Sequence, residues 1–428
     1  MSNFKIAVIA IFSVCFVVGI VLFAMYKAGA GQTTANITIW GTIPGQAFNA
    51  AYKASSISGN KYVTVNYVKK DADSFDADFV EALADGAGPD AVILREDSIY
   101  KNRNKFLTIP YATYSERTFK DQFIQEGEMF LKDEGVMAVP LAIDPLVMYW
   151  NRDIFTNNLV SQPPKYWDEI YGLVKTMTRR DSSGNVMQSA ISFGEYNNVT
   201  NAKAILSLLF LQAGTPIVSY TNGAYLSVLS SQLNSQVLPG QAALDYYTQF
   251  SNPTSAAYSW NRSLPSSLNF FLSGNLSLYV GFASEIFSIQ QKNPNLNFDV
   301  TNIPQDRQSK TKIDFAHMYA GAIVKQSKSA SAAFSVIIAL TEPAAQTAME
   351  AATNLPPVRR DLLANKPSDP FRSVFYSSAL VSRSWLDPDS TATGNTFRDM
   401  IESITSGQAR VSEALGNANS SIDSLLLK

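Results

Sequence analysis

Cysteine and histidine are almost absent from this chain of 428 residues. The single cysteine, Cys15, excludes an intrachain disulfide bond, and together with the single histidine, His317, it leaves too few ligands for a zinc site. No G-x-S-x-G turn accompanies His317, so the sequence does not indicate a serine hydrolase triad. We therefore expect no metal, no cofactor and no catalytic activity.

Charged residues are also scarce, at 16% of the chain, and 34 Lys and Arg residues nearly balance 36 Asp and Glu residues. No basic stripe is present that could neutralise a run of phosphates, which argues against nucleic acid as a partner. Hydrophobic residues amount to 46%, which is typical of folded rather than disordered proteins. A chain of this length is expected to form two domains or one large two-lobed unit.

One long apolar run is present, over residues 6–25. A helix that spans a bilayer needs about 20 such residues. The sequence therefore predicts a single-pass anchor over residues 1–27, a tether over residues 28–36, and a cell-membrane location with the bulk of the chain extracellular or periplasmic. The alternative is a cleaved signal peptide that ends near Ala28-Gly29-Ala30, although secretory apolar segments usually run only about 7 to 15 residues.

After the tether, short apolar strands alternate with segments of helical periodicity. Strands are predicted at residues 37–40, 63–67 and 91–94, and Phe75 and Phe79 mark one of the helices between them. Further helices are predicted at residues 202–212, 240–250, 264–272, 330–340 and 396–404, with short buried strands at residues 276–281 and 321–324. This order predicts an α/β fold built from βαβ units with a mainly parallel sheet.

Several short motifs follow one another in a fixed order along the chain. They are Gly88-Pro89-Asp90, Gly135-Val136-Met137-Ala138-Val139-Pro140, Met148-Tyr149-Trp150-Asn151-Arg152, Pro163-Pro164-Lys165-Tyr166-Trp167-Asp168-Glu169, Phe271-Leu272-Ser273-Gly274-Asn275 and Asn354-Leu355-Pro356-Pro357. Each motif alone is loose, but their order covers nearly everything after residue 37. In that order the chain resembles the extracellular solute-binding proteins of the maltose-binding type.

This resemblance implies a two-lobed, periplasmic-binding-protein-like fold of type II, with a ligand cleft between two α/β lobes. Lobe 1 is expected to comprise residues 36–143 and 304–341, and lobe 2 residues 144–303 and 342–428. Pro145 suits the crossing between them because proline limits the conformations of a connection. The chain is expected to act as a monomer.

The resemblance also implies a function, which is the solute-binding component of an ABC importer. Such a protein binds a small solute, here a sugar or oligosaccharide, and delivers it to permease subunits in the membrane. One alternative is a membrane-held glycoside-acting enzyme, for which Asp144 and Glu195 are the carboxylate pair to nominate. Another is a sensor ectodomain, which would need a separate signalling partner because only about five residues precede the apolar run.

In this family, aromatic faces stack on sugar rings while carboxylates and amides accept hydroxyl protons. The candidate ligand contacts in this sequence are Trp40, Thr42, Asp97, Asp144, Glu195, Tyr196 and Phe282. Trp40 and Thr42 end the first strand, where a parallel sheet presents its carboxyl edge. Trp40 could equally pack within its lobe, Asp97 could be a solvated acid, and Asp144 could instead hold the hinge.

The sequence departs from the family pattern at two of these positions. Ser98 replaces the arginine that commonly follows the acidic contact, and the Gly-x-Trp platform reads Gly281-Phe282-Ala283. Phe282 keeps an aromatic face but lacks an indole donor, which weakens any assignment of maltodextrin itself. Glu195 and Tyr196 fall where the family presents a stacking aromatic from lobe 2, although residues of a surface loop would show the same pattern.

Overall fold

The first three predicted strands form a parallel sheet. The computed structural model describes residues 34–221, 224–231 and 238–427, and in it β1 (Ala35–Gly41) pairs in parallel with both β2 (Val63–Lys69) and β3 (Ala91–Arg95). The connecting helices are α2 (Gly45–Ala54) and α3 (Phe75–Ala84). Phe75 and Phe79 lie one turn apart on the buried face of α3, as their spacing predicted.

The sheet continues through strands that pair antiparallel with their neighbours. β14 (Asp314–Ile323) pairs antiparallel with β3, and β7 (Val139–Asn151) pairs antiparallel with β14. The expectation of a mainly parallel sheet is therefore wrong beyond β3, because β14 returns from the other half of the molecule and lies between β3 and β7. The full order is β2-β1-β3-β14-β7-β12-β9-β8, with β13 also paired to β7 and β15 to β14.

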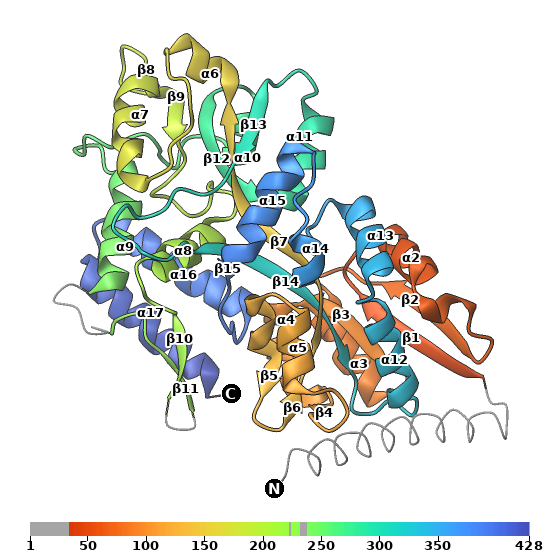
Figure 1. The fold of residues 1–428 in the computed structure, drawn as a ribbon. Helices are drawn as coiled ribbons and strands as arrows, with labels where there is room; N and C mark the ends of the chain where they lie inside the picture. Colours follow the sequence, from red (N-terminus) through yellow and green to blue (C-terminus); the bar gives the residue numbers. More distant parts are fainter. Residues whose placement is uncertain (1–33, 222–223, 232–237, 428) are drawn as a thin grey trace, which may run out of the picture.

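β7 is a single strand that belongs to both halves of the molecule (Figure 1). Its residues up to Pro145 pair with β14, and its residues from Leu146 onward pair with β12 (Leu276–Phe282). Its register with β14 shifts between Tyr319 and Ala320, opposite Pro140. Proline cannot donate to the ladder, so an irregularity at this point accommodates it.

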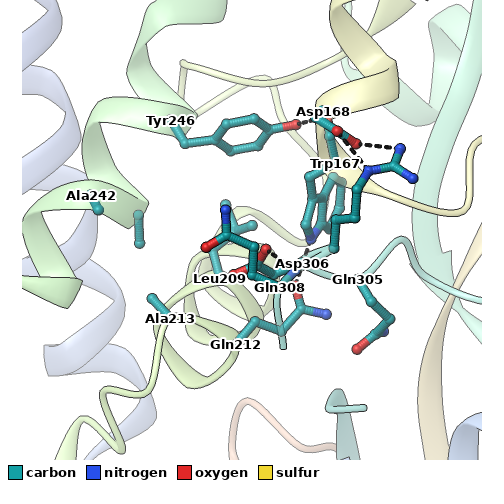
Figure 2. Close-up of a pocket in the computed structure, with 12 residues that line it drawn as sticks. Trp167, Asp168, Leu209, Gln212, Ala213, Ala242, Tyr246, Gln305, Asp306 and Gln308 are labelled. Carbon is teal, nitrogen blue, oxygen red and sulfur yellow. Dashed lines mark hydrogen bonds and ion pairs between the residues drawn. The ribbon is translucent and has the colours of Figure 1, made fainter. Parts of the chain in front are cut away.

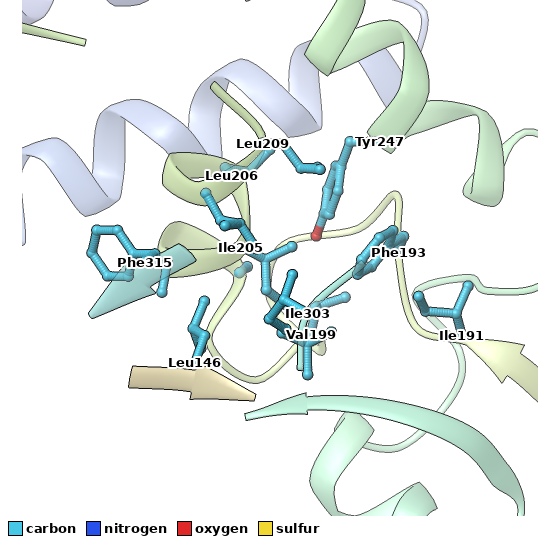
Figure 3. Packing of buried hydrophobic residues seen from close by; sticks show 14 of the residues in the cluster. Leu146, Ile191, Phe193, Val199, Ile205, Leu206, Leu209, Tyr247, Ile303 and Phe315 are labelled. Atoms are coloured by element: carbon cyan, nitrogen blue, oxygen red, sulfur yellow. The ribbon is translucent and has the colours of Figure 1, made fainter. Parts of the chain in front are cut away.

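Two separate hydrophobic cores define the two lobes. The core of lobe 1 includes Phe48, Phe79, Ile93, Phe119 and Ile337. The core of lobe 2 includes Tyr149, Phe210, Trp260, Phe271 and Phe397. Figure 3 shows part of the second core, where Leu146 of β7 and Phe315 of β14 lie near α8 (Ala202–Gln212). Ile143 and Ala316 belong to the first core, so both strands pass from one core to the other within a few residues.

In the part of the chain that returns from lobe 2 to lobe 1, the boundaries of the lobes differ from those expected. Phe315 packs in the core of lobe 2, although residues 304–341 were assigned to lobe 1. Helix α13 (Pro343–Thr353) packs on α2, and its Met349 belongs to the core of lobe 1, although residues from 342 onward were assigned to lobe 2. The apolar face of α13 determines which lobe the helix packs in. The sequence pattern predicts this face but not the surface that it packs against.

The remaining elements complete the two lobes. Lobe 1 also contains α4 (Glu96–Lys101), β4 (Ile109–Pro110), α5 (Glu116–Gln122), β5 (Leu131–Lys132), β6 (Gly135–Val136), α12 (Ala330–Ala339) and α14 (Arg360–Leu363). Lobe 2 contains α6 (Arg152–Asn157), α7 (Ile170–Met177), β8 (Arg179–Arg180), β9 (Val186–Ile191), β10 (Val218–Thr221), β11 (Ala224–Ser227), α9 (Pro239–Thr248), α10 (Ser267–Leu272), α11 (Ile286–Lys292), β13 (Phe298–Thr301), α16 (Ser390–Thr405) and α17 (Val411–Leu426). Between the lobes lie α15 (Pro370–Val381) and β15 (Ser382–Arg383), since Phe375 packs in one core and Tyr376 in the other.

The predicted anchor over residues 1–27 and most of the tether lie outside the described residues. Among the helices that the structure describes, none is by itself long and apolar enough to cross a bilayer. Only α12 and α13 taken together meet that length and composition, and they are bent by 70° relative to each other.

Candidate functional site

A cavity of about 440 Å³ lies where the two lobes meet. Both lobes and both crossing strands contribute to its wall. The lining residues are Arg95, Glu96, Asp97, Asp144, Asn201, Lys203, Ala204, Ser207, Phe282, Ser284, Glu285, Phe315, His317, Tyr319, Ser384, Trp385, Asp387 and Ser390. Three of the residues nominated from the sequence, Asp97, Asp144 and Phe282, are therefore brought together here.

Asp97 forms a charged pair with an arginine that precedes it. The Arg95 guanidinium contacts the Asp97 carboxylate through Nη2 at 2.6 Å, and Asp97 is only 3% exposed. Burial acts to raise the pKa of Asp97, but the charge of Arg95, with those of His317 and Lys203, outweighs it and holds the pKa well below its ordinary value. The charged pair that Ser98 puts in doubt is thus present, with the arginine two residues before the acid.

Glu96 is the first residue of α4, and it connects lobe 1 to β14, the strand that returns from lobe 2. Its carboxylate lies 2.7 Å from Nδ1 of His317 and accepts a hydrogen bond from the backbone N–H of Met318 at 2.8 Å. The Ser384 hydroxyl donates to the same carboxylate at 3.3 Å. Glu96 is 2% exposed, so these contacts compensate a carboxylate removed from water.

Asp144 lies on β7 at the crossing and is 5% exposed. Its Oδ1 accepts a hydrogen bond from the backbone N–H of Ser284 at 3.0 Å. In the ladder it stands opposite His317 of β14. Burial raises the pKa of Asp144 to about 6, and the hydrogen bonds from Ser284 and the His317 charge only partly oppose this effect.

On the lobe 2 side, Lys203 is held by a buried acid. Its ammonium group donates to Asp387 and to the carbonyl oxygen of Ser390, the latter at 2.9 Å. Burial raises the pKa of Asp387, an effect that Lys203 opposes. Lys203 also lies over the ring of Trp385, 5.7 Å from its centre. The Trp385 indole N–H donates to Ser207 at 3.0 Å, which fixes the ring.

Phe282 ends β12 and presents its ring to the imidazole of His317. The two rings are stacked, with centroids 4.8 Å apart and an interplanar angle of 26°. Glu285 holds the turn after Phe282, because its Oε1 accepts from the Phe282 backbone N–H at 2.8 Å and from Asn201 at 2.6 Å. The aromatic wall of the cavity is therefore built by residues from both lobes.

The two nominated residues at the end of β1 do not line this cavity. The half-buried Trp40 ring meets Phe75 edge-on at 6.5 Å, and the ammonium group of Lys70 lies 4.0 Å from its centre. The backbone N–H of Thr42 donates to the carbonyl oxygen of Ile93. Trp40 thus packs within its lobe, which was the alternative to a ligand contact.

Glu195 and Tyr196 are also absent from the cavity wall. Glu195 is buried and pairs with Arg262 at 3.5 Å. Tyr196 packs against the core of lobe 2 beside Gly394 of α16, and burial raises its pKa to about 12. Asp144 and Glu195, the carboxylates nominated for glycoside cleavage, are therefore not assembled in this cavity.

Several residues that line the cavity were not predicted from the sequence, although one of them carried a signal. Lys203 is the single charged residue of α8, an otherwise apolar helix buried on nearly every face. A lysine in such a helix requires a partner. Asp387 and Asn201 offered no comparable signal, because each lies in a polar stretch of sequence.

Contacts beside the cavity join α4 of lobe 1 to lobe 2. The Lys101 ammonium bridges Asp76 of lobe 1 at 2.7 Å and Asp389, which precedes α16, at 3.0 Å. The ring of Tyr100 meets that of Tyr225 in β11 edge-on, with centroids 5.7 Å apart. One short helix therefore lines the cavity through its first turn and contacts the opposite lobe through its last.

A second cavity, of about 330 Å³, lies within lobe 2 between α8, α9 and residues 305–308 (Figure 2). Its polar groups already have partners: the Trp167 indole donates to Gln212 at 2.5 Å, and Arg307 pairs with Asp168 at 2.9 Å. The inter-lobe cavity, with its many ionisable side chains, is therefore the stronger candidate for a site.

A family model described as "Bacterial extracellular solute-binding protein" matches residues 46–371. No curated protein matches the chain significantly. Similar solved structures include a cyclo/maltodextrin-binding protein complexed with maltotetraose, which is 16% identical with a TM-score of 0.72 over 91% of this chain and 96% of that chain. A cyclic alpha-maltosyl-1,6-maltose binding protein from Arthrobacter globiformis is 15% identical, with a TM-score of 0.75 over 92% and 99%. The maltotriose-bound MalE domain from Bdellovibrio bacteriovorus is 14% identical, with a TM-score of 0.66 over 92% and 100%.

Proposed function

The chain belongs to the bacterial extracellular solute-binding protein family, and from this premise we propose that it is the receptor of an ABC importer for a carbohydrate or similar polyol. The observation that carries the proposal is the cavity between the lobes. Asp97 from lobe 1, Asp144 on the crossing strand and Phe282 from lobe 2 all face it. Carboxylates that accept hydroxyl protons beside aromatic rings are suited to a polyol.

Closure of the lobes around the solute follows from this arrangement. A solute that contacts Asp97 and Phe282 at once favours the state in which the two lobes are close. The residues that line the cavity come from both lobes of one chain, so the proposed site needs no second copy and we expect a monomeric receptor. Residues 1–27 anchor it to the membrane and keep it near the permease subunits, which raises their effective concentration.

Titration of the purified full-length chain with neutral and amino mono- and disaccharides tests this function. We expect saturable heat and a change in Trp385 fluorescence with at least one sugar. Phe282→Leu, which keeps an apolar side chain but removes the ring face, is expected to weaken binding about tenfold. Phe287→Leu on α11 is the matched control, since Phe287 is 48% exposed and outside the cavity. Absence of saturable binding across the panel, or release of a cleaved product, would contradict the proposal.

The contacts between α4 and lobe 2 make a separate prediction about closure. Lys101→Met removes the pair with Asp389, which is present only when the lobes are close. A partly exposed ion pair contributes about 0.2–1 kcal/mol, so affinity for the solute is expected to fall about two- to fivefold.

Isothermal titration at low and high salt measures this effect, and the difference from the unsubstituted chain should vanish at high salt because such pairs are screened. Lys120→Met is the control, because Lys120 pairs with Glu116 and Glu128 within lobe 1. Equal losses of affinity in both variants would refute a role for Lys101 in closure.

A further inference from the structure

The charges that line the inter-lobe cavity are not balanced. Five carboxyl groups face it, from Glu96, Asp97, Asp144, Glu285 and Asp387, against the cations of Arg95 and Lys203 and the imidazole of His317. Each basic group is already matched to one acid: Arg95 to Asp97, Lys203 to Asp387, and His317 to Glu96. Two carboxyl groups, those of Asp144 and Glu285, remain without a basic partner of their own.

Glu285 is satisfied by neutral donors. The Tyr279 hydroxyl donates to one of its oxygens, and Asn201 and the Phe282 backbone N–H donate to the other. This carboxyl group serves the turn after β12 and has little capacity left for a solute.

Asp144 is different, because within the described part of the chain its hydrogen bonds come from Ser284 alone. The backbone N–H and the hydroxyl group of Ser284 are both neutral donors, so neither supplies a charge that balances the carboxylate. The nearby charged groups are His317, which already contacts Glu96, and Glu285. A buried carboxylate without a matched cation is unfavourable until one is supplied.

Aromatic rings accompany this carboxylate. Phe282, Phe315, Tyr319 and Trp385 line the same cavity. The faces of such rings attract a cation placed within about 6 Å. A carboxylate among aromatic rings is suited to bind a positively charged group that is attached to a ring with an apolar face.

We propose that the solute carries a positively charged amino group that donates to Asp144, which makes it an amino sugar rather than a neutral or acidic one. This inference rests on the proposed function and narrows its solute class. A hydroxyl group would donate to Asp144 without compensating its charge, whereas an ammonium group would both donate and balance the charge. Acidic sugars are disfavoured, because Arg95 and Lys203 are engaged and the remaining carboxylates repel an anion.

Matched pairs of sugars test the inference on the full-length chain. The probes are glucosamine with glucose, galactosamine with galactose, and the disaccharide of glucosamine with cellobiose, each with its N-acetylated form. At neutral pH we expect at least one amine to bind about ten- to a hundredfold more tightly than its neutral counterpart, and acetylation to remove that advantage.

Asp144→Asn is expected to bring the amine down to the affinity of the neutral sugar, whereas Asp133→Asn, an exposed site in the turn between β5 and β6, leaves the preference unchanged. Cooperative thermal unfolding of both variants establishes that they are folded. Neutral sugars that bind as tightly as their amines, or an amine preference that survives in Asp144→Asn, would overturn the inference and leave the proposed function standing. If no member of any pair binds, both fail.

Discussion

Replacing Asp144 by asparagine is expected to stabilise the solute-free protein at neutral pH by about 2–3 kcal/mol. Burial raises the pKa of Asp144 from its ordinary value to about 6, so the folded state holds this proton more tightly than the unfolded state does. The contribution of Asp144 to the free energy of unfolding therefore decreases as pH rises from about 4 to about 6, and stays low above that range. Asparagine carries no such charge and can still accept the hydrogen bond from Ser284.

Urea unfolding of both proteins between pH 4 and pH 7.5 measures this difference. Subtracting the two curves isolates Asp144, because the other acids of the cavity titrate in both proteins. The gap in stability should be near zero at pH 4 and reach its full size above pH 6, and Asp133→Asn should show no such gap. An Asp144→Asn protein that is less stable at pH 7.5 would show that the carboxylate is compensated in the free receptor. A substitution in a binding site often increases the stability of the protein while it reduces affinity, because the site is arranged for its ligand.

Lys203→Met is expected to have an opposite and larger effect, a loss of about 3–5 kcal/mol in the free energy of unfolding. Lys203 is 22% exposed on its side chain and Asp387 is 6% exposed, so the substitution leaves a buried carboxylate with neutral partners only. Those partners are the Thr393 hydroxyl at 2.8 Å and the Asp389 backbone N–H at 3.2 Å.

The double variant Lys203→Met with Asp387→Leu separates the cost of the unpaired charge from the value of the pair. Because removing both charges avoids the uncompensated carboxylate, the double variant should recover most of the stability that the single variant loses. Urea unfolding at pH 7.5 compares the three proteins. A double variant as unstable as the single one would mean that the lost contact between the Lys203 ammonium group and the Trp385 ring, rather than the unpaired carboxylate, dominates.

Local patterns in the sequence predicted individual elements well. Residues 202–212 form α8 as expected, since a largely apolar segment of that length is more typical of a buried helix than of a strand. The strand after Gly88-Pro89-Asp90 and the motif order also gave the two-lobed α/β fold. Each of these features depends on residues close together in the chain.

Pairings between distant segments could not be predicted in the same way. Glu96 and His317 are separated by 221 positions, and their contact depends on β14 returning beside α4. The lobe of α13 depends on which surface its apolar face meets, which periodicity does not encode. The family pattern places an arginine after the acid, so the sequence did not predict Arg95, two positions before Asp97, as its partner.

β7 runs without a break through both halves of the molecule, and this continuity affects how the protein folds. Each lobe is assembled from chain segments that are far apart in sequence, so neither can form from one contiguous stretch as the chain is synthesised. Melting of either core would strip β7 of hydrogen-bonded neighbours that the other half also needs. The described residues should therefore unfold in one cooperative transition, and refolding should be slow for a chain whose contacts are so non-local.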